Sequence, residues 1–224
     1  MDNTTKATDN KHTTKAVDNT KLPVIADAKV NLSLDETFDV EELQGRRIYI
    51  NEDVDDALIT SVVFHILRYN RQDEGLPVEK RKPIVIFINS PGGVVADGFG
   101  VIDAMLTSKT PIYTVNLATC ASMGLLIYLA GTVRFSMPHA QFLMHDGSTA
   151  GWDSTAKMKD RMEFETVQLE AMTREYILSR TSISEEFYKE KYRIEWYFLP
   201  KEGKEHGFVH KIIGSDCELD DIYS

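Results

Sequence analysis

Three short segments of the sequence contain candidate catalytic residues. The first is Asn89–Gly93, in which two consecutive glycines follow an apolar run. Glycines at a strand-to-helix turn let the backbone approach a ligand closely and direct N–H groups toward developing negative charge. The segment is neither a GxGxxG nor a Walker sequence, so it does not support nucleotide binding. A tight structural turn is the commoner explanation of this motif taken alone.

The second segment, Cys120–Gly124, places Ser122 between small residues at the start of an apolar stretch. Small neighbours on both sides of a serine are typical of a nucleophile elbow, a sharp turn that exposes the hydroxyl. A serine that caps a helix N-terminus is the common alternative, and on this segment alone we favour it. Cys120 is a second candidate nucleophile, but its place at the end of an apolar strand favours a packing role.

The third segment ends an apolar run with His145. A histidine at the carboxyl end of a strand lies at the sheet edge where sites of α/β proteins form, although a structurally satisfied histidine is the commoner case. His206 and His210 have i, i+4 spacing, but Gly207 between them weakens any helix, so we expect no metal site. Together, the glycine turn, the serine and the strand-end histidine are the parts of an acyl-transfer site.

The elements that must position these residues alternate along the chain. The apolar run at 83–88 is nearly continuous, which indicates a strand buried on both faces of a parallel sheet. The other expected strands are 47–50, 112–115, 133–135 and 141–144, and helical spacing covers 53–68, 95–106 and 123–129. This alternation with short connections predicts an α/β fold.

Residues 155–179 form an unusually long helical stretch. At about 1.5 Å per residue it would extend roughly 37 Å, which is longer than a small domain is wide. A helix of this length must either cross the domain or project from it, and projection favours packing against another subunit. A plain surface helix explains the spacing equally well.

Length, charge and cysteine usage limit the class of protein. The 224 residues suffice for one globular domain with a substantial core, and the net charge of -10 argues against a nucleic-acid binder. Cys120 and Cys217 form no CxxC pair, which argues against a disulfide framework or a cysteine zinc site and favours a reducing compartment. The sequence has no apolar run of about 18 residues and no apolar segment typical of a secretory signal. We therefore expect a cytoplasmic protein without a membrane span.

The N-terminal region differs from the rest of the chain. Residues 1–30 are mostly polar, and Thr-Thr-Lys-Ala at 4–7 returns at 13–16. Such a segment buries too little apolar surface to offset its ordering entropy, so we expect a disordered tail. A pro-segment or gating arm is one interpretation, and an untethered leader is the one we favour. Residues 31–224 are expected to form a single catalytic domain.

The motifs together resemble one family. Residues 84–145 carry Asn-Ser-Pro-Gly-Gly, Ala-Ser-Met-Gly, Ala130-Gly131 and Met-His in this order, and this combination resembles the proteolytic subunit of the Clp protease. A weaker similarity extends over roughly 46–214 and includes Glu205–Val209. The resemblance implies a crotonase-like α/β fold with a long projecting handle helix. It also implies homo-oligomeric heptameric rings, two of them stacked through that helix.

The resemblance also implies roles for individual residues. Ser122 would be the nucleophile, His145 the general base, and the N–H groups of Gly93 and Met123 the oxyanion hole. Glu195 stands where the family has an aspartate, and its longer side chain is still able to orient an imidazole. The implied activity is serine-type hydrolysis of unfolded polypeptides through an acyl-enzyme inside an oligomeric chamber. It needs no cofactor or metal, and an AAA+ unfoldase is the possible partner.

Several positions depart from the family pattern. Asp146-Gly147 replaces the usual Gln-Pro, residues 148–152 replace a glycine-rich entry to the handle, and Arg193-Ile194 replaces a charged pair. These changes leave open a catalytically inactive ring subunit that assembles with an active paralogue. A crotonase-type acyl-CoA enzyme is a third alternative, because it shares the glycine-rich oxyanion site but needs no serine nucleophile.

Overall fold

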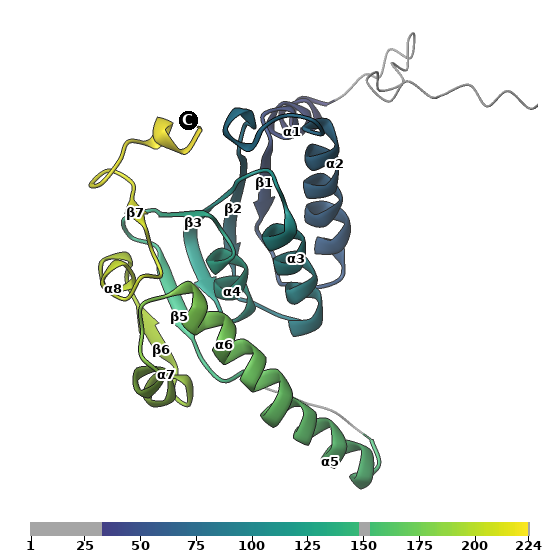
Figure 1. Ribbon diagram of the computed structural model, residues 1–224, viewed down its shortest axis with the longest axis vertical. Coiled ribbons are helices and arrows are strands. Elements are labelled where there is room, and N and C mark those ends of the chain that lie inside the picture. The colour runs from purple at the N-terminus through teal and green to yellow at the C-terminus, as the bar shows by residue number, and fades with distance from the viewer. Residues whose placement is uncertain (1–32, 148–152, 224) are drawn as a thin grey trace, which may run out of the picture.

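The computed structural model describes residues 33–147 and 153–223, and a seven-stranded sheet forms its centre (Figure 1). The strand order is β1-β2-β3-β4-β7, with β5 paired to β3 and β6 paired to β5. Among the described strands, only the β5–β6 pair is antiparallel. The strands are β1 (Arg47–Ile50), β2 (Ile84–Ser90), β3 (Ile112–Ala121), β4 (Val133–Ser136), β5 (Gln141–Met144), β6 (Trp196–Phe198) and β7 (Lys211–Ile212).

The described helices include two π segments and two short 3₁₀ segments. The α-helices are α1 (Leu34–Gln44), α2 (Phe64–Gln72), α3 (Val95–Thr107), α4 (Met123–Leu129), α5 (Thr155–Glu163), α6 (Glu170–Arg180), α7 (Glu185–Tyr192) and α8 (Pro200–Glu205). The π segments are η1 (Ile59–Val63) and η3 (Phe164–Leu169), and the 3₁₀ segments are η2 (Val78–Lys80) and η4 (Leu219–Tyr223). Strands and helices alternate as expected, which confirms the predicted α/β fold. None of the described helices combines the length and the apolar character that crossing a bilayer requires.

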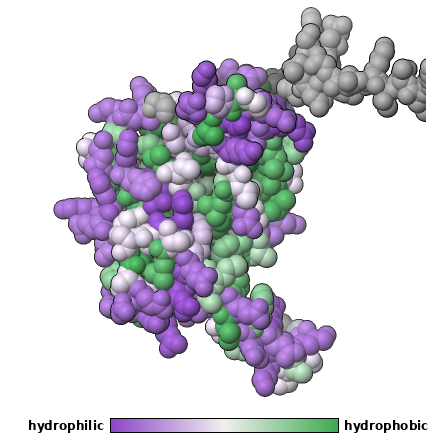
Figure 2. Space-filling model, in the orientation of Figure 1, coloured by the Kyte–Doolittle hydropathy of each residue, from purple (hydrophilic) through white to green (hydrophobic). Residues whose placement is uncertain are grey.

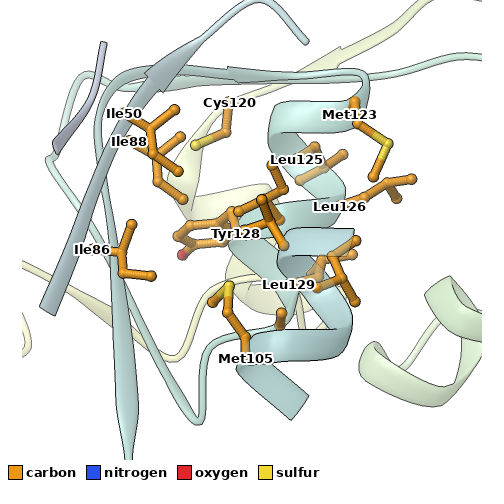
Figure 3. Packing of buried hydrophobic residues seen from close by; sticks show 14 of the residues in the cluster. Ile50, Ile86, Ile88, Met105, Cys120, Met123, Leu125, Leu126, Tyr128 and Leu129 are labelled. Carbon is orange, nitrogen blue, oxygen red and sulfur yellow. The ribbon is translucent and has the colours of Figure 1, made fainter. Parts of the chain in front are cut away.

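The main core lies between the sheet and α4, which is buried along its whole length. Ile86 and Ile88 of β2 point from the sheet toward Tyr128 and Leu125 of α4 (Figure 3). Full burial of an aliphatic side chain of this size contributes about 1.5–3 kcal/mol. The helix that begins after Ser122 is therefore held firmly against the centre of the sheet.

The other face of the sheet carries a second, smaller apolar cluster. Val85 and Phe87 of β2 point into it, so β2 is buried on both faces as predicted. The C-terminal segment closes this cluster with Ile213 and the fully buried Ile222. Alternate residues of one strand thus supply two separate cores.

The predicted long helix is confirmed. Segments α5, η3 and α6 follow one another without a break from Thr155 to Arg180, and they project from the body of the molecule (Figure 1). The sequence pattern did not predict the π segment η3. A π segment inserts one extra residue into a turn, so the apolar residues before and after it follow different stripes.

The prediction of a helix over 53–68 is wrong in its first turn. Val54 pairs with Gly93 in an isolated parallel bridge, and helical conformation begins only at Ala57 and continues to Gln72. The bridge gives Val54 a partner far along the chain, which helical spacing does not reveal. The predicted disordered tail and the altered handle-entry segment at 148–152 lie outside the described residues.

Candidate active site

Ser122 occupies a strained turn between β3 and α4. Its backbone has φ 52° and ψ -123°, a conformation that costs an L-residue on the order of 1–3 kcal/mol. The residue stands at the N-cap position of α4, but its hydroxyl makes no capping hydrogen bond. Ser122 therefore occupies the position of a helix-capping serine, but its side chain does not cap the helix. A sharp strand-to-helix turn whose serine hydroxyl makes no hydrogen bond within the described residues fits the geometry of a nucleophile elbow.

Backbone hydrogen bonds hold this turn in place. The N–H of Ser122 donates to the carbonyl of Leu143 at 3.0 Å, which ties the turn to β5. The carbonyl of Ser122 accepts from the N–H groups of Leu125 at 3.1 Å and Leu126 at 3.3 Å. The strain is thus sustained by contacts on both sides of the serine.

The glycine turn after β2 lies directly against Ser122. Gly92 has φ 101°, and a Cβ atom there would lie 2.6 Å from the Cβ of Ser122. Gly93 has φ 152°, and a Cβ atom there would overlap the carbonyl oxygen of Val54. The N–H of Val54 donates to the carbonyl of Gly92 at 2.8 Å. Only glycine fits both the backbone conformation and the close approach at these positions.

Two backbone donors beside the serine remain unused. The N–H groups of Gly93 and Met123 have no backbone acceptor in residues 33–147 and 153–223. Met123 is the first residue of α4, where an N–H group has no partner within the helix. Because Gly92 contacts Ser122, the two donors belong to segments that touch. The arrangement is compatible with the oxyanion hole expected from the sequence.

His145 follows directly after β5 and is half-buried. Leu143 of β5 is the Cα partner of Ala121 at the end of β3, so Ser122 and His145 leave the carboxyl ends of two neighbouring parallel strands. The fold therefore brings both expected residues to one edge of the sheet. The described part of the chain shows no hydrogen bond between the Ser122 hydroxyl and the His145 ring.

Glu195 directly precedes β6 and is exposed. Met144 pairs with Trp196 in the antiparallel register, so extending this pairing by one residue sets Glu195 opposite His145. Directly opposed residues have Cα atoms about 4.5–5.5 Å apart. The carboxylate of Glu195 accepts a hydrogen bond from the Tyr197 hydroxyl at 3.3 Å, and no bond to His145 occurs within the described residues. The strand register aligns the expected acid with the base, while the side chain of the acid accepts from Tyr197.

The other candidates from the sequence have structural roles. Cys120 is fully buried in the main core, where burial raises the pKa of its thiol well above the ordinary value, which confirms the packing interpretation. His206 packs with its ring centroid 4.5 Å from that of Phe187. The Nδ1 atom of His210 accepts a hydrogen bond from the backbone N–H of Arg134 at 3.2 Å. No cluster of three or more metal-ligating side chains occurs in the described residues.

Sequence reasoning missed Tyr197, the residue that contacts the expected acid. The signal was present, because residues i and i+2 of a strand share one face. A tyrosine two positions after a candidate triad glutamate, at the start of a short strand, is thus able to reach its carboxylate.

Comparisons with known proteins identify the family of the chain. A profile described as Clp protease matches residues 36–216. The chain is 30% identical over 194 residues to ATP-dependent Clp protease proteolytic subunit 2 of Corynebacterium diphtheriae, covering 85% of this chain and 94% of that protein. It is 30% identical over 178 residues to the subunit 2 of Tropheryma whipplei, covering 76% and 92%. It is 29% identical over 174 residues to the subunit 1 of Frankia casuarinae, covering 76% and 78%. This chain belongs to the Clp protease family.

Proposed function

We propose that the chain is a serine endopeptidase that hydrolyses unfolded polypeptides through an acyl-enzyme, as a proteolytic subunit of the ATP-dependent Clp type. The observation that carries this proposal is the strained Ser122 turn packed against Gly92, beside the N–H groups of Gly93 and Met123, which have no backbone acceptor within the described residues. A strained serine beside unused backbone donors is the arrangement that acyl transfer requires.

Each residue then has a defined step. The Ser122 oxygen attacks the carbonyl carbon of the peptide bond while His145 takes its proton. The resulting oxyanion accepts hydrogen bonds from the N–H groups of Gly93 and Met123. Collapse of the tetrahedral intermediate breaks the C–N bond, and His145 returns the proton to the leaving amine. A water molecule then attacks the acyl ester by the same route and regenerates Ser122, and Glu195 stabilises the imidazolium in both halves.

Exposed apolar residues support an oligomeric form of this enzyme. Ile59, Phe64 and Leu67 are between 40% and 58% exposed along η1 and α2, and Figure 2 shows hydrophobic atoms gathered over α2 and α3. On the projecting helix α5, Met158 and Met162 line a groove of about 550 Å³. Exposed apolar residues gathered in this way are typical of interfaces. We infer that copies of this chain pack through these surfaces as stacked heptameric rings that enclose the site.

The remaining parts of the proposal concern partners and compartment. An AAA+ unfoldase would deliver substrate, because folded proteins do not enter an enclosed chamber. Both cysteines are free thiols, as in a reducing compartment, and we place this activity in the cytoplasm. Neither nucleic acid nor membrane is part of the proposed function.

A fluorophosphonate probe tests the proposal, because it reacts with an activated serine. We expect the probe to label the wild-type protein at Ser122, as mapped by peptide mass spectrometry, and to fail with Ser122→Ala. Ser61→Ala is the matched control, since it removes an exposed hydroxyl on η1 that bonds only a helix carbonyl. Equal labelling of the wild type and of Ser122→Ala would contradict the assignment.

The contact between Glu195 and Tyr197 favours a second candidate function, a catalytically inactive ring subunit that assembles with an active paralogue. An inactive subunit needs no contact between its acid and its base. If the purified protein alone forms the Ser122 adduct and cleaves an unstructured peptide, this alternative is wrong.

A further inference from the structure

The expected acid of the triad has a competing partner. The Tyr197 hydroxyl donates to Oε2 of Glu195 at 3.3 Å, and the negative charge of Glu195 raises the pKa of that hydroxyl. Both residues are exposed, Tyr197 at 59%, so their side chains are free to move. A contact of this kind is weak enough to exchange.

The strand register sets the two possible partners of Glu195 on one face. Tyr197 opposes Leu143, so the next pair on the same face is Glu195 and His145. The residues that alternate with them point to the other face, where Trp196 and Phe198 are buried in the main core. The buried side chains thus hold strand β6 against the main core, and only its exposed side chains rearrange.

We propose that Tyr197 is a positioning residue that holds Glu195 in a resting pose, and that the triad is completed when Glu195 exchanges the Tyr197 hydroxyl for the His145 ring. This inference rests on the proposed function. Glu195 reaches either group from one backbone position, so the exchange needs only a change of side-chain rotamer. The carboxylate then stabilises the imidazolium only in the exchanged pose.

Tyr197→Phe tests the exchange because it removes the hydroxyl and keeps the ring. We expect the rate of fluorophosphonate labelling at Ser122 to rise about 3- to 10-fold, because Glu195 loses its competing donor. The NMR resonance of the His145 ring N–H should move downfield in the same variant, because that N–H then donates to a carboxylate. Asp146, the other carboxylate beside His145, is unchanged in every variant.

Tyr49→Phe is the matched control. The Tyr49 hydroxyl donates to Oε2 of Glu42 at 2.8 Å at a site on β1 and α1, so the same atom is removed from the same kind of pair. We expect neither the labelling rate nor the His145 ring N–H resonance to change. Glu195→Gln should make the Tyr197→Phe substitution silent, since the exchange then has no carboxylate to move.

The possible failures are distinguishable. The exchange is overturned if the labelling rate in Tyr197→Phe does not rise or if the His145 ring N–H resonance does not move downfield. Labelling at Ser122 leaves the peptidase proposal intact in that case. An effect of Tyr197→Phe that persists in Glu195→Gln also overturns it. If the wild type is not labelled at all, the peptidase proposal fails. The His145 ring N–H resonance still decides in that case whether Tyr197 holds Glu195 away from the ring.

Discussion

The two ends of α4 are built in opposite ways, although the helix has only seven residues. At its N-terminal end Ser122 is strained, and the N–H of Met123 lacks a backbone partner in the described part of the chain. At its C-terminal end the carbonyls of Leu129 and Gly131 accept from the Arg180 guanidinium at 2.9 and 2.8 Å. Cations at a helix C-terminus interact favourably with the helix dipole. One end keeps strain and an N–H group without a backbone partner among the described residues, and the other end is stabilised by charge.

Arg134 extends the network at the C-terminal end. Its buried guanidinium donates to the carbonyls of Phe208 and Gly207 at 2.7 Å each and to that of Arg180 at 3.0 Å. Burial lowers the pKa of Arg134 to about 10, so the group still carries its charge at neutral pH. A helix anchored firmly at one end is able to hold a strained turn at the other. The candidate catalytic serine and the arginines that stabilise the helix thus lie at opposite ends of α4, about two helical turns apart.

The largest expected effect separates activity from stability at the N-terminal end. Ser122→Gly should lower the rate of peptide hydrolysis by at least about 10⁴-fold, because the nucleophile is gone. Glycine adopts φ 52° without steric cost, so the free energy of unfolding should rise by about 1 kcal/mol. Hydrolysis assays and thermal unfolding at matched protein concentration measure the two effects.

Ser122→Ala is the control for this variant, because it removes the hydroxyl and retains a Cβ atom. We expect the same loss of hydrolysis without the gain in stability. A Ser122→Gly protein that is no more stable than Ser122→Ala would show that the turn stores no strain.

Substitution at the C-terminal end should have the opposite outcome. Arg134→Met leaves the carbonyls of Phe208, Gly207 and Arg180 without a donor, and we expect the free energy of unfolding to fall by about 3–5 kcal/mol. Denaturant unfolding measures this change, and fluorophosphonate labelling of Ser122, counted per folded molecule, should stay close to that of the wild type. Arg68→Met on the exposed face of α2 is the control. Labelling that falls as steeply as stability would show that the two ends of α4 are coupled.

A smaller effect is expected at the glycine turn. In Gly93→Ala the new Cβ overlaps the carbonyl oxygen of Val54, so the N–H of residue 93 moves away from the oxyanion. Loss of one oxyanion donor lowers kcat by about 10²-fold, and we expect a loss of that size in peptide hydrolysis. Gly75→Ala is the control, because Gly75 also has a positive φ of 83° but has no atom within 4 Å of an added Cβ. A wild-type rate in Gly93→Ala would exclude this donor.

The sequence predicted the elements whose signals are local. The strands at 47–50 and 141–144 and the helix at 123–129 have the predicted bounds, because each is a short apolar run with clear ends. The start of the helix after Asp53 was misplaced because the partner of Val54 is Gly93, which belongs to another element. Apolar spacing is also too degenerate to indicate a π segment such as Phe164–Leu169.

The candidate site also combines local motifs, which the sequence shows, with contacts between distant segments, which it does not show. The motifs around Gly93, Ser122 and His145 were visible in the sequence, and the fold brings these segments to one sheet edge. The contact between Glu195 and Tyr197 depends on the β5–β6 register, which no sequence pattern specifies. The sequence did not predict the Arg134 network either, because the carbonyl partners of Arg134 come from separate segments.

The smallest expected effect is a pH dependence at the C-terminal end of α4. The Nδ1 atom of His210 accepts a hydrogen bond from the backbone N–H of Arg134. Burial and the charges of Arg134 and Arg180 lower the pKa of His210 from 6.5 to about 4. Below pH 6.5 the unfolded chain therefore binds a proton that the folded chain does not, and the free energy of unfolding falls until the pH reaches about 4. His210 is exposed, so solvent screening limits the expected loss to about 1–2 kcal/mol.

Denaturant unfolding between pH 7 and pH 4 measures this slope. His210→Asn should flatten it, because the Asn side-chain oxygen accepts from the Arg134 N–H without titrating in this range. His139→Asn, on the exposed turn between β4 and β5, is the matched control and should keep the wild-type slope. If His210→Asn and the wild type lose stability equally, His210 does not titrate as inferred. The acid sensitivity of the fold would then have to arise outside the network that anchors α4.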